Sequence, residues 1–213
     1  MNEILTELSR AIIDGQAEAA TSQVQAAIDA GIEPTVILND GMIAAMREVG
    51  RRFESGQYYV PEMLIAARAM KNALALLEPR LKQADVKPAG KVIAGTVRGD
   101  LHDIGKNLVC MMLQGAGFEI VDLGNNVAPD KFVAAAGQDG IPIVALSALL
   151  TTTMPAMKET VDAFLRAGLR DRVKIIVGGA PVTEAFARAI GADGFAPDAS
   201  RAVSLAQSLL AAA

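Results

Sequence analysis

Residues 91–107 read KVIAGTVRGDLHDIGKN, and this stretch decides the fold. Its first seven residues form a short apolar run with β-branched side chains, which predicts a buried strand. A polar loop, RGDLHD, comes next, and IGKNLVCMMLQGAG then has the pattern of a helix that ends at glycines. A strand, a loop and a helix in this order are the first half of a βαβ unit.

The same alternation continues toward the C-terminus. Four further apolar runs predict strands, and each is followed by a predicted helix: FEIVDLG and PDKFVAAAGQDG, IPIVALSAL and TMPAMKETVDAFLRAG, VKIIVGG and TEAFARAIG, ADGFAP and DASRAVSLAQSLLAA. Strands that are apolar along their whole length indicate a parallel sheet covered on both faces. We therefore expect a doubly wound, five-stranded parallel sheet of the flavodoxin or Rossmann-like kind, which binds ligands at the carboxyl ends of its strands.

Before residue 88 every segment predicts a helix. The first two helices lie in LTELSRAIIDG and AEAATSQVQAAIDAG, Pro34 opens a third that runs through ILNDGMIAAMREVGRRFESG, and Pro61 opens a fourth, PEMLIAARAMKNALALLEP, expected to stop before Pro79. Short connections between four helices favour an antiparallel bundle. The polar segment LKQADVKPAGK indicates a linker, so we expect a four-helix cap domain at 1–88 and an α/β domain at 89–213.

Composition excludes several classes of protein. A formal net charge of -4 argues against nucleic-acid binding. A single cysteine excludes a disulfide framework and a Cys-x-x-Cys pair, which favours a reducing, cytoplasmic location. No run of 18 apolar residues indicates a membrane span, and the N-terminus lacks the apolar core of a signal peptide.

Three loops with unusual residues follow predicted strands. They are RGDLHDIGKN after the first, SALLTTTMP (Ser147–Pro155) after the third, and GGAPV (Gly178–Val182) after the fourth. Because the carboxyl ends of parallel strands share one edge of the sheet, all three are expected at the binding edge.

The first of these loops holds the only histidine, His102, between Asp100 and Asp103. Asp100 could accept a hydrogen bond from one imidazole nitrogen, orient the ring and raise the basicity of the other nitrogen. One histidine without a nearby cysteine cannot form a closed zinc site, but it suits a metal that brings its other ligands, as a macrocycle does. A surface histidine whose neighbouring aspartates cap the next helix is the alternative, and for this motif alone it is the more common case.

The other loop residues are weak evidence when taken singly. GDLHDIG is not a G-x-G-x-x-G motif, and the chain has no P-loop and no nucleophile elbow. Gly178-Gly179 alone more often marks a tight turn, and Ser147 with Thr151–Thr153 could merely cap the next helix.

The three motifs together are more specific. Asp100-x-His102-x-x-Gly105 is followed, after residues 106–146, by Ser147-x-Leu149, and after residues 150–177 by Gly178-Gly179. This ordered set resembles the signature of corrinoid proteins that bind cobalamin in the base-off, His-on mode. The helical half resembles the cap that precedes the cobalamin domain in methionine synthase, and the whole chain is similar to the corrinoid proteins of methylamine, glycine betaine and aryl-ether methyltransferase systems.

The resemblance implies a role for each loop. His102 would be the lower axial ligand of cobalt, Asp100 would hold its other nitrogen, and Thr153, where methionine synthase has serine, would complete a relay. The remaining implied cofactor contacts fall into three groups. Those that would frame the lower face of the corrin are Gly99, Leu101, Asp103, Ile104 and Gly105, and those that would line the slot for the displaced dimethylbenzimidazole tail are Ser147, Leu149, Thr151, Gly178, Gly179 and Ala199. The upper face would be shielded by Tyr59 and Met63. For Tyr59 and Met63, packing in the core of the bundle is an equal alternative.

The resemblance also implies partners. The chain would shuttle a methyl group, cycling between methylcobalamin and cob(I)alamin, from a substrate:corrinoid methyltransferase to a second methyltransferase that uses tetrahydrofolate or a thiol. A reductive activase would restore the cofactor, and residues 81–90 would act as the hinge when the cap opens. It would thus be a carrier subunit rather than an enzyme by itself.

Three other interpretations remain open. A cobalamin-dependent sensor uses the same cap and domain but usually adds a DNA-binding module. The small subunit of an adenosylcobalamin mutase shares the histidine motif, and the helical cap argues against it. A flavodoxin-like module without cobalamin would not explain the ordered set of motifs.

Overall fold

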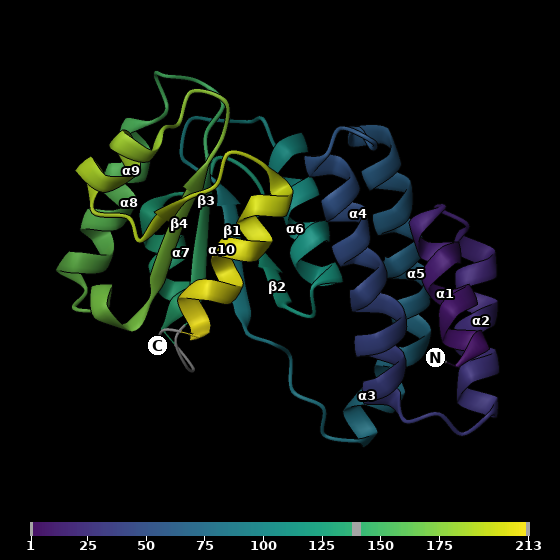
Figure 1. The fold of residues 1–213 in the computed structure, drawn as a ribbon. Coiled ribbons are helices and arrows are strands. Elements are labelled where there is room, and N and C mark those ends of the chain that lie inside the picture. The colour runs from purple at the N-terminus through teal and green to yellow at the C-terminus, as the bar shows by residue number, and fades with distance from the viewer. Residues whose placement is uncertain (1, 138–141, 212–213) are drawn as a thin grey trace. The chain divides into compact units, whose positions relative to one another are not determined.

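A computed structural model describes residues 2–137 and 142–211 of the chain. The chain divides into two compact units, Met1–Ala89 with Gln114–Gly117, and Gly90–Leu113 with Phe118–Ala213 (Figure 1). None of the described helices is long and apolar enough to cross a membrane.

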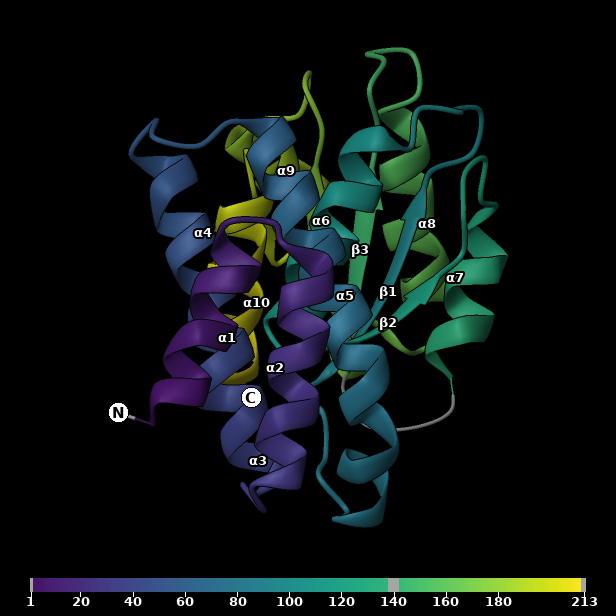
Figure 2. The same ribbon diagram turned by 90° about the vertical axis from the view of Figure 1, so that its right-hand side faces the viewer.

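The first unit is helical, as predicted. Within its described residues, four helical rods follow one another, and the third combines two α-helical pieces with a π-helical segment between them (Figure 2). Gly15 and Gly31 follow the first two rods with φ of +72° and +71°, a backbone conformation that glycine adopts without strain. The rods are α1 (Glu3–Ile13), α2 (Ala17–Asp29), α3 (Pro34–Val36) with η1 (Ile37–Ile43) and α4 (Ala44–Glu54), and α5 (Val60–Gln83).

The predicted end of the fourth helix is wrong. We expected it to stop before Pro79, but α5 continues through Pro79 to Gln83. Proline removes one backbone donor from the helical ladder, yet Leu77 and Leu81 on either side of it are buried, and this packing holds the last turn in helical form. The segment without helix or strand between the units is therefore 84–90 rather than 81–90.

The second unit has the predicted α/β architecture. In the described part of the chain, five parallel strands form one sheet in the order β2-β1-β3-β4-β5, the flavodoxin-like order. Residues 138–140 of the predicted second helix, Ile141 of the predicted third strand and Ala212 of the closing helix lie outside the described residues. The elements are β1 (Lys91–Thr96), α6 (Ile104–Gly115), β2 (Glu119–Asp122), α7 (Pro129–Ala136), β3 (Ile143–Ser147), α8 (Pro155–Arg166), η2 (Arg170–Arg172), β4 (Lys174–Gly178), α9 (Glu184–Ile190), β5 (Gly194–Phe195) and α10 (Ala199–Ala211).

The sheet is buried because its central strands are apolar on both faces. Alternate residues such as Ile93, Val144 and Ile175 pack on one face with Phe132 of α7 and Phe164 of α8. Right-handed crossovers put α7, α8 and α9 on this face and α6 and α10 on the other.

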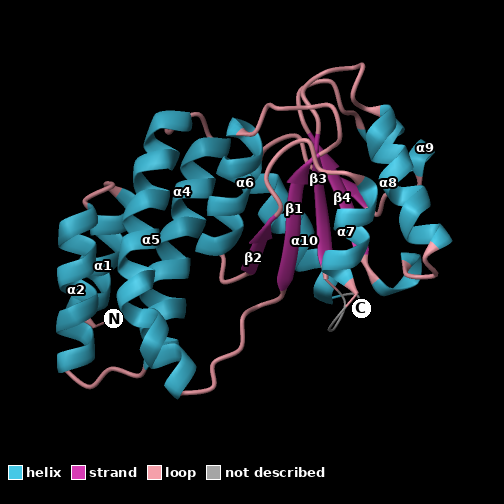
Figure 3. Ribbon diagram, turned by 180° about the vertical axis from the view of Figure 1, so that it is seen from behind, coloured by secondary structure: helices cyan, strands magenta, loops and turns pink. Residues whose placement is uncertain are grey.

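The carboxyl ends of β1, β3 and β4 meet at one edge. Thr96 pairs with Ser147, and Ser147 pairs with Gly178, so the last residues of the three strands lie side by side. Figure 3 shows the loops that follow these strands gathered above this edge. The three loops that the sequence analysis selected are thus neighbours in the fold.

Candidate functional site

A single carboxylate, that of Asp100, organises the loops at this edge. Asp100 is fully buried, and within the described residues five hydrogen bonds converge on its carboxylate. Oδ1 accepts from the backbone N–H of His102 (3.0 Å) and lies 2.8 Å from its Nδ1. Oδ2 accepts from the Thr153 hydroxyl (2.7 Å) and from the N–H groups of Leu149 (2.8 Å) and Leu150 (3.3 Å).

This environment keeps Asp100 ionised. Burial alone would raise the pKa of Asp100, but hydrogen bonds from Thr153, from the His102 amide and from the Leu149 amide outweigh burial and lower the pKa below its usual value. A carboxylate that stays charged accepts hydrogen bonds and donates none. The partner nitrogen of His102 must therefore carry the proton.

His102 consequently presents its other nitrogen. With Nδ1–H donating to Asp100, a neutral imidazole has its free electron pair on Nε2. The side chain is 51 % exposed, and within the described residues Nε2 has no hydrogen-bond partner. Thr96, buried at the end of β1, donates its hydroxyl to the His102 carbonyl (3.1 Å) and fixes the loop from below. An oriented imidazole with an open Nε2 is suited to bind a metal.

Thr153, which sequence analysis chose among three threonines, is the one that reaches Asp100. Thr153 is buried and also lies 2.9 Å from the Leu150 carbonyl, whereas Thr151 is exposed. No threonine side chain caps α8, whose first residue is Pro155. The helix-capping alternative is therefore not what the described structure contains at Thr153.

Apolar side chains surround the exposed histidine. Leu101 is 67 % and Ile104 79 % exposed, and Leu149 and Leu150 of the facing loop are also exposed. A Cβ added at Gly105 would meet nothing within 4 Å. Water-exposed leucine and isoleucine around one imidazole, with open space at a glycine, are what a broad apolar ligand would cover.

The two glycines after β4 have a structural reason that the sequence did not reveal. A Cβ on Gly179, whose φ is +126°, would lie 1.9 Å from the Ala148 carbonyl oxygen, and a Cβ on Gly178 would lie 2.9 Å from that of Ala196. Backbones of the neighbouring loops thus pass too close for a side chain. Ser147, half-buried at the end of β3, lies beside Gly178 in the sheet.

The remaining predicted contacts lie in different surroundings. Gly99 and Asp103 belong to the His102 loop. Ala199, expected in the last loop, is instead the first residue of α10 and is buried. In the helical unit Tyr59 is 67 % exposed whereas Met63 has no exposed surface, so bundle packing describes Met63 but not Tyr59.

An ion pair beside the site was missed by sequence analysis. Lys106, in the first turn of α6, is buried, and its Nζ contacts both carboxylate oxygens of Asp122 (2.7 and 2.6 Å) and Oδ1 of Asn107 (2.6 Å). A buried lysine is stable only when it is paired, so this contact ties the start of α6 to the end of β2. The partners are 16 positions apart in the sequence, so no local pattern could detect the pair.

The donor set decides which metal could bind. Across residues 2–137 and 142–211, no group of three or more His, Cys, Asp or Glu side chains could hold a metal ion. One half-exposed imidazole among apolar side chains therefore fits a metal that already has a ring of ligands. Cobalt in a corrin is such a metal, and the residues present fit it.

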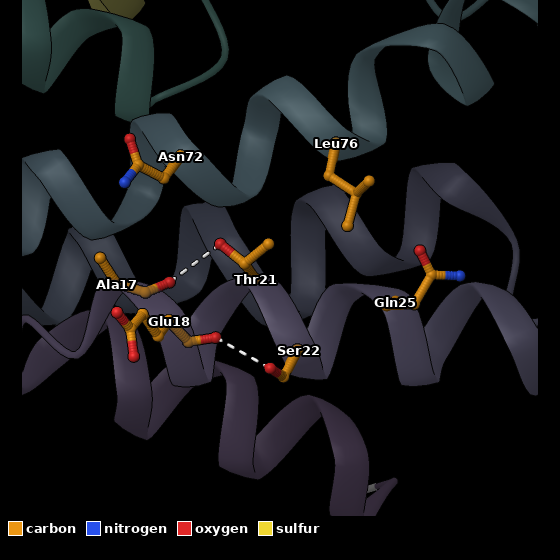
Figure 4. Close-up of a pocket in the computed structure, with 7 residues that line it drawn as sticks. All are labelled: Ala17, Glu18, Thr21, Ser22, Gln25, Asn72 and Leu76. Carbon is orange, nitrogen blue, oxygen red and sulfur yellow. Dashed lines mark hydrogen bonds between the residues drawn. The ribbon is translucent and has the colours of Figure 1, made fainter.

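A groove in the helical unit offers no such chemistry. It lies between α2 and α5, and Figure 4 shows the residues that line it: Ala17, Glu18, Thr21, Ser22, Gln25, Asn72 and Leu76. The Thr21 and Ser22 hydroxyls donate to carbonyls of Ala17 and Glu18 in their own helix (2.9 and 3.0 Å). These groups are satisfied locally and converge on no common point.

Comparison with known proteins identifies the family. Two family models match, a B12 binding domain over residues 90–204 and a second B12 binding domain over residues 4–78. A corrinoid protein of Desulfitobacterium hafniense (strain Y51) is 39 % identical over 210 residues, covering 97 % of each chain. Dimethylamine corrinoid protein 1 of Methanosarcina mazei is 41 % identical over 209 residues, covering 98 % of this chain and 96 % of the relative.

A solved structure is also similar. The methanol:cobalamin methyltransferase complex of Methanosarcina barkeri contains a chain that matches with a TM-score of 0.86 and 28 % identity. The match covers 100 % of this chain and 81 % of that one.

Proposed function

This chain belongs to the B12-binding corrinoid proteins, and on that premise we propose that it binds cobalamin through His102 and carries a methyl group between two methyltransferases. The observation that carries the proposal is the orientation of His102, whose Nδ1 lies 2.8 Å from a buried, ionised Asp100 while Nε2 is free within the described residues. Bound cobalamin would supply a cobalt centre that takes up and gives away a methyl group.

Three residues have a defined task in this proposal. Nε2 of His102 would ligate cobalt, and Asp100 would hold the proton on Nδ1. Thr153 donates its hydroxyl to Asp100 Oδ2 and keeps the carboxylate turned toward the imidazole.

The remaining predicted contacts would serve the body of the cofactor. Leu101, Ile104 and Gly105 are exposed and would lie under the corrin, with Gly99 and Asp103 at its edge. The ends of β3 and β4 would hold the tail through Ser147, Leu149, Thr151, Gly178 and Gly179, with Ala199 flanking it. Tyr59 would shield the upper face of the cofactor, and its exposure to solvent supports this role more than the burial of Met63 supports a role for that residue.

Partners follow from the carrier role. The similar proteins are named for dimethylamine and for a methanol:cobalamin methyltransferase complex, which supports a partner that loads the chain from a small methylated substrate. A second methyltransferase then passes the methyl group to tetrahydrofolate or a thiol, and a reductive activase restores the cofactor. We assign the hinge between the domains to residues 84–90, which form neither helix nor strand.

Reconstitution with hydroxocobalamin tests the proposal. The wild-type chain is expected to retain the corrinoid through gel filtration and to change its absorption spectrum as the imidazole replaces the tail base. His102→Ala should lose this spectral change, while Thr21→Ala, a control in the α2/α5 groove, should keep it. A chain that retains no corrinoid, or a His102→Ala spectrum identical to that of the wild type, would contradict His-on binding.

A further inference from the structure

Asn126, in the loop between β2 and α7, forms two hydrogen bonds with the backbone of the histidine loop, which comprises residues 98–103. Its side-chain Oδ1 accepts a hydrogen bond from the Gly99 N–H (2.8 Å), and its own backbone N–H donates to the Asp100 carbonyl (2.9 Å). Both bonds reach the dipeptide that carries the buried carboxylate. Asn126, 27 positions away in the sequence from Gly99, therefore binds both the N–H of Gly99 and the carbonyl of Asp100.

The backbone of Asn126 is specialised for this contact. Its φ is +50°, in the left-handed region, where asparagine is far more frequent than other residues that have a side chain. Gly99 has a φ of +84°. Both residues of the Gly99–Asn126 hydrogen bond thus have left-handed backbone conformations. An alanine at position 126 would lack the Oδ1 acceptor and would strain the backbone.

The loop that carries Asn126 is itself fixed. Gly124 accepts a hydrogen bond from the Thr96 N–H (3.0 Å), and the Val127 N–H donates to the Thr96 carbonyl (2.9 Å). Asp122, which is paired with the buried Lys106, also accepts from the Gly124 N–H (2.9 Å). Asn126 therefore belongs to a segment that hydrogen bonds hold against β1, and it can fix the backbone positions of residues 99–100.

The histidine loop needs such support because it has little structure of its own. Residues 101–103 form neither helix nor strand, and the Leu101 side chain is exposed. Asp100 accepts hydrogen bonds on both carboxylate oxygens. Its Oδ1 can stay within hydrogen-bonding distance of His102 Nδ1 only if the Asp100 backbone is fixed in position. An error of about 1 Å in such a contact is enough to lose a geometry-dependent function.

We propose that Asn126 is a positioning residue for His102: by holding Gly99 and Asp100 it keeps Asp100 Oδ1 on Nδ1, so that Nε2 is the nitrogen offered for ligation. The consequence for cofactor binding rests on the proposed function. The positioning itself is a property of the chain without cofactor and is tested there.

The single histidine makes the test direct. In a cofactor-free chain labelled with ¹⁵N-histidine, the imidazole NMR signals report the tautomer of His102 alone. The variants are Asn126→Gly, which keeps the left-handed backbone and removes the acceptor, and Asn126→Asp, which keeps an acceptor. Asn125→Gly is the matched control, because the only hydrogen bond of the Asn125 side chain within the described residues is a long one, 3.5 Å to the Leu101 carbonyl.

The outcomes separate clearly when the imidazole is neutral, so the spectra are recorded at alkaline pH. The wild type, Asn126→Asp and Asn125→Gly should each show the Nδ1–H tautomer with a hydrogen-bonded Nδ1 proton. Asn126→Gly should lose that proton signal and show exchange between the two tautomers. A wild-type signal in Asn126→Gly would overturn the proposal, as would an equal loss in Asn126→Asp.

The unmodified chain gives a second test that does not depend on a folded variant. The Gly99 amide, although at an exposed residue, should exchange with solvent roughly tenfold or more slowly than an unstructured glycine amide, because it donates to Asn126. Exchange at the unprotected rate would overturn the proposal. If both tests succeed and the chain fails to retain corrinoid, the proposed function is wrong and the positioning of His102 by Asn126 stands.

Discussion

Two sets of polar groups, one in each unit of this chain, are used in opposite ways. In the helical unit Thr21 donates to Ala17 within α2, and Arg51 and Arg52 bind Glu48 one turn earlier within α4. In the α/β unit the groups around the Asp100 carboxylate come from distant segments and converge, since Thr153 and Asp100 are 53 residues apart. Local pairing stabilises a helix, whereas long-range convergence orients a side chain.

The same contrast between local and long-range hydrogen bonds distinguishes the α2/α5 groove from the candidate site at the edge of the sheet. The α2/α5 groove is concave, but the two hydroxyls that line it bind carbonyls of their own helix. The edge of the sheet offers an imidazole that five hydrogen bonds on a neighbouring carboxylate hold in one orientation, counted over the described residues. The convergence of polar groups, rather than a concave surface, is the feature that points to the candidate site.

The largest effect is expected at a glycine of the converging loops. Gly179→Ala would place a Cβ 1.9 Å from the Ala148 carbonyl oxygen at a φ of +126°. Strain and overpacking together should cost roughly 4 kcal/mol of unfolding free energy. Gly31→Ala in the helical unit is the control, because its φ is +71° but its Cβ would meet nothing within 4 Å, and it should cost only about 1 kcal/mol. Equal losses in urea unfolding would break the comparison.

Removal of the central carboxylate should have the next largest effect. Asp100→Ala leaves the backbone amides of His102 and Leu149 without their acceptor, and the loss of unfolding free energy should be about 3 kcal/mol. Asp130→Ala, an exposed aspartate in the first turn of α7, should cost only about 0.5 kcal/mol. Denaturant unfolding of the cofactor-free chain measures both, and an Asp100→Ala value as small as the control would refute a convergent network.

Removal of a single threonine hydroxyl should have a smaller effect on the free energy of unfolding, and the size of the loss should differ between the two units. Thr153→Ala should cost about 1 kcal/mol, and Thr153→Ser, which keeps the hydroxyl, should recover most of it. Thr21→Ala should change stability by no more than about 0.5 kcal/mol, because alanine favours the helix and offsets the lost bond to Ala17. Thermal unfolding distinguishes the two, and a larger loss at Thr21 than at Thr153 would reverse the comparison.

The smallest effect concerns local charge pairing in α4. Hydrogen bonds from Arg51 and Arg52 lower the pKa of Glu48 to about 2. A lowered pKa stabilises the fold above the unfolded-state pKa, about 4.3, and this contribution is lost as the pH falls toward 2. Wild type should therefore exceed Glu48→Gln by about 0.5 kcal/mol at neutral pH, and the difference should disappear in acid. A difference that grows on acidification would contradict the assigned direction.

The sequence predicted most of the architecture because its signals are local. Apolar runs bounded by glycine and proline located the strands and helices, and the order of loops put His102, Ser147 and Gly178 on one edge. Pro79 misled the prediction of a helix end because burial of Leu77 and Leu81 outweighs the loss of one backbone donor.

The candidate site was predictable only in part, for a similar reason. The Asp100–His102 hydrogen bond follows from spacing, and Thr153 could be selected only among three candidates. The contacts of Asn126 with Gly99 and of Lys106 with Asp122 join residues 27 and 16 positions apart, and no periodicity records them. Those supports become visible only when the chain is folded.

The central claim is that His102 Nε2 is the axial ligand of cobalt, and electron paramagnetic resonance of the Co(II) form tests it most directly. An axial ¹⁴N nucleus splits the cobalt lines into three, whereas ¹⁵N splits them into two. Because the chain has one histidine, ¹⁵N-histidine labelling marks Nδ1 and Nε2 of His102 alone. The account predicts that labelling converts three-line splitting to two-line splitting; three-line splitting that persists after labelling would mean that the ligand is the cofactor's own base, and the account would be wrong.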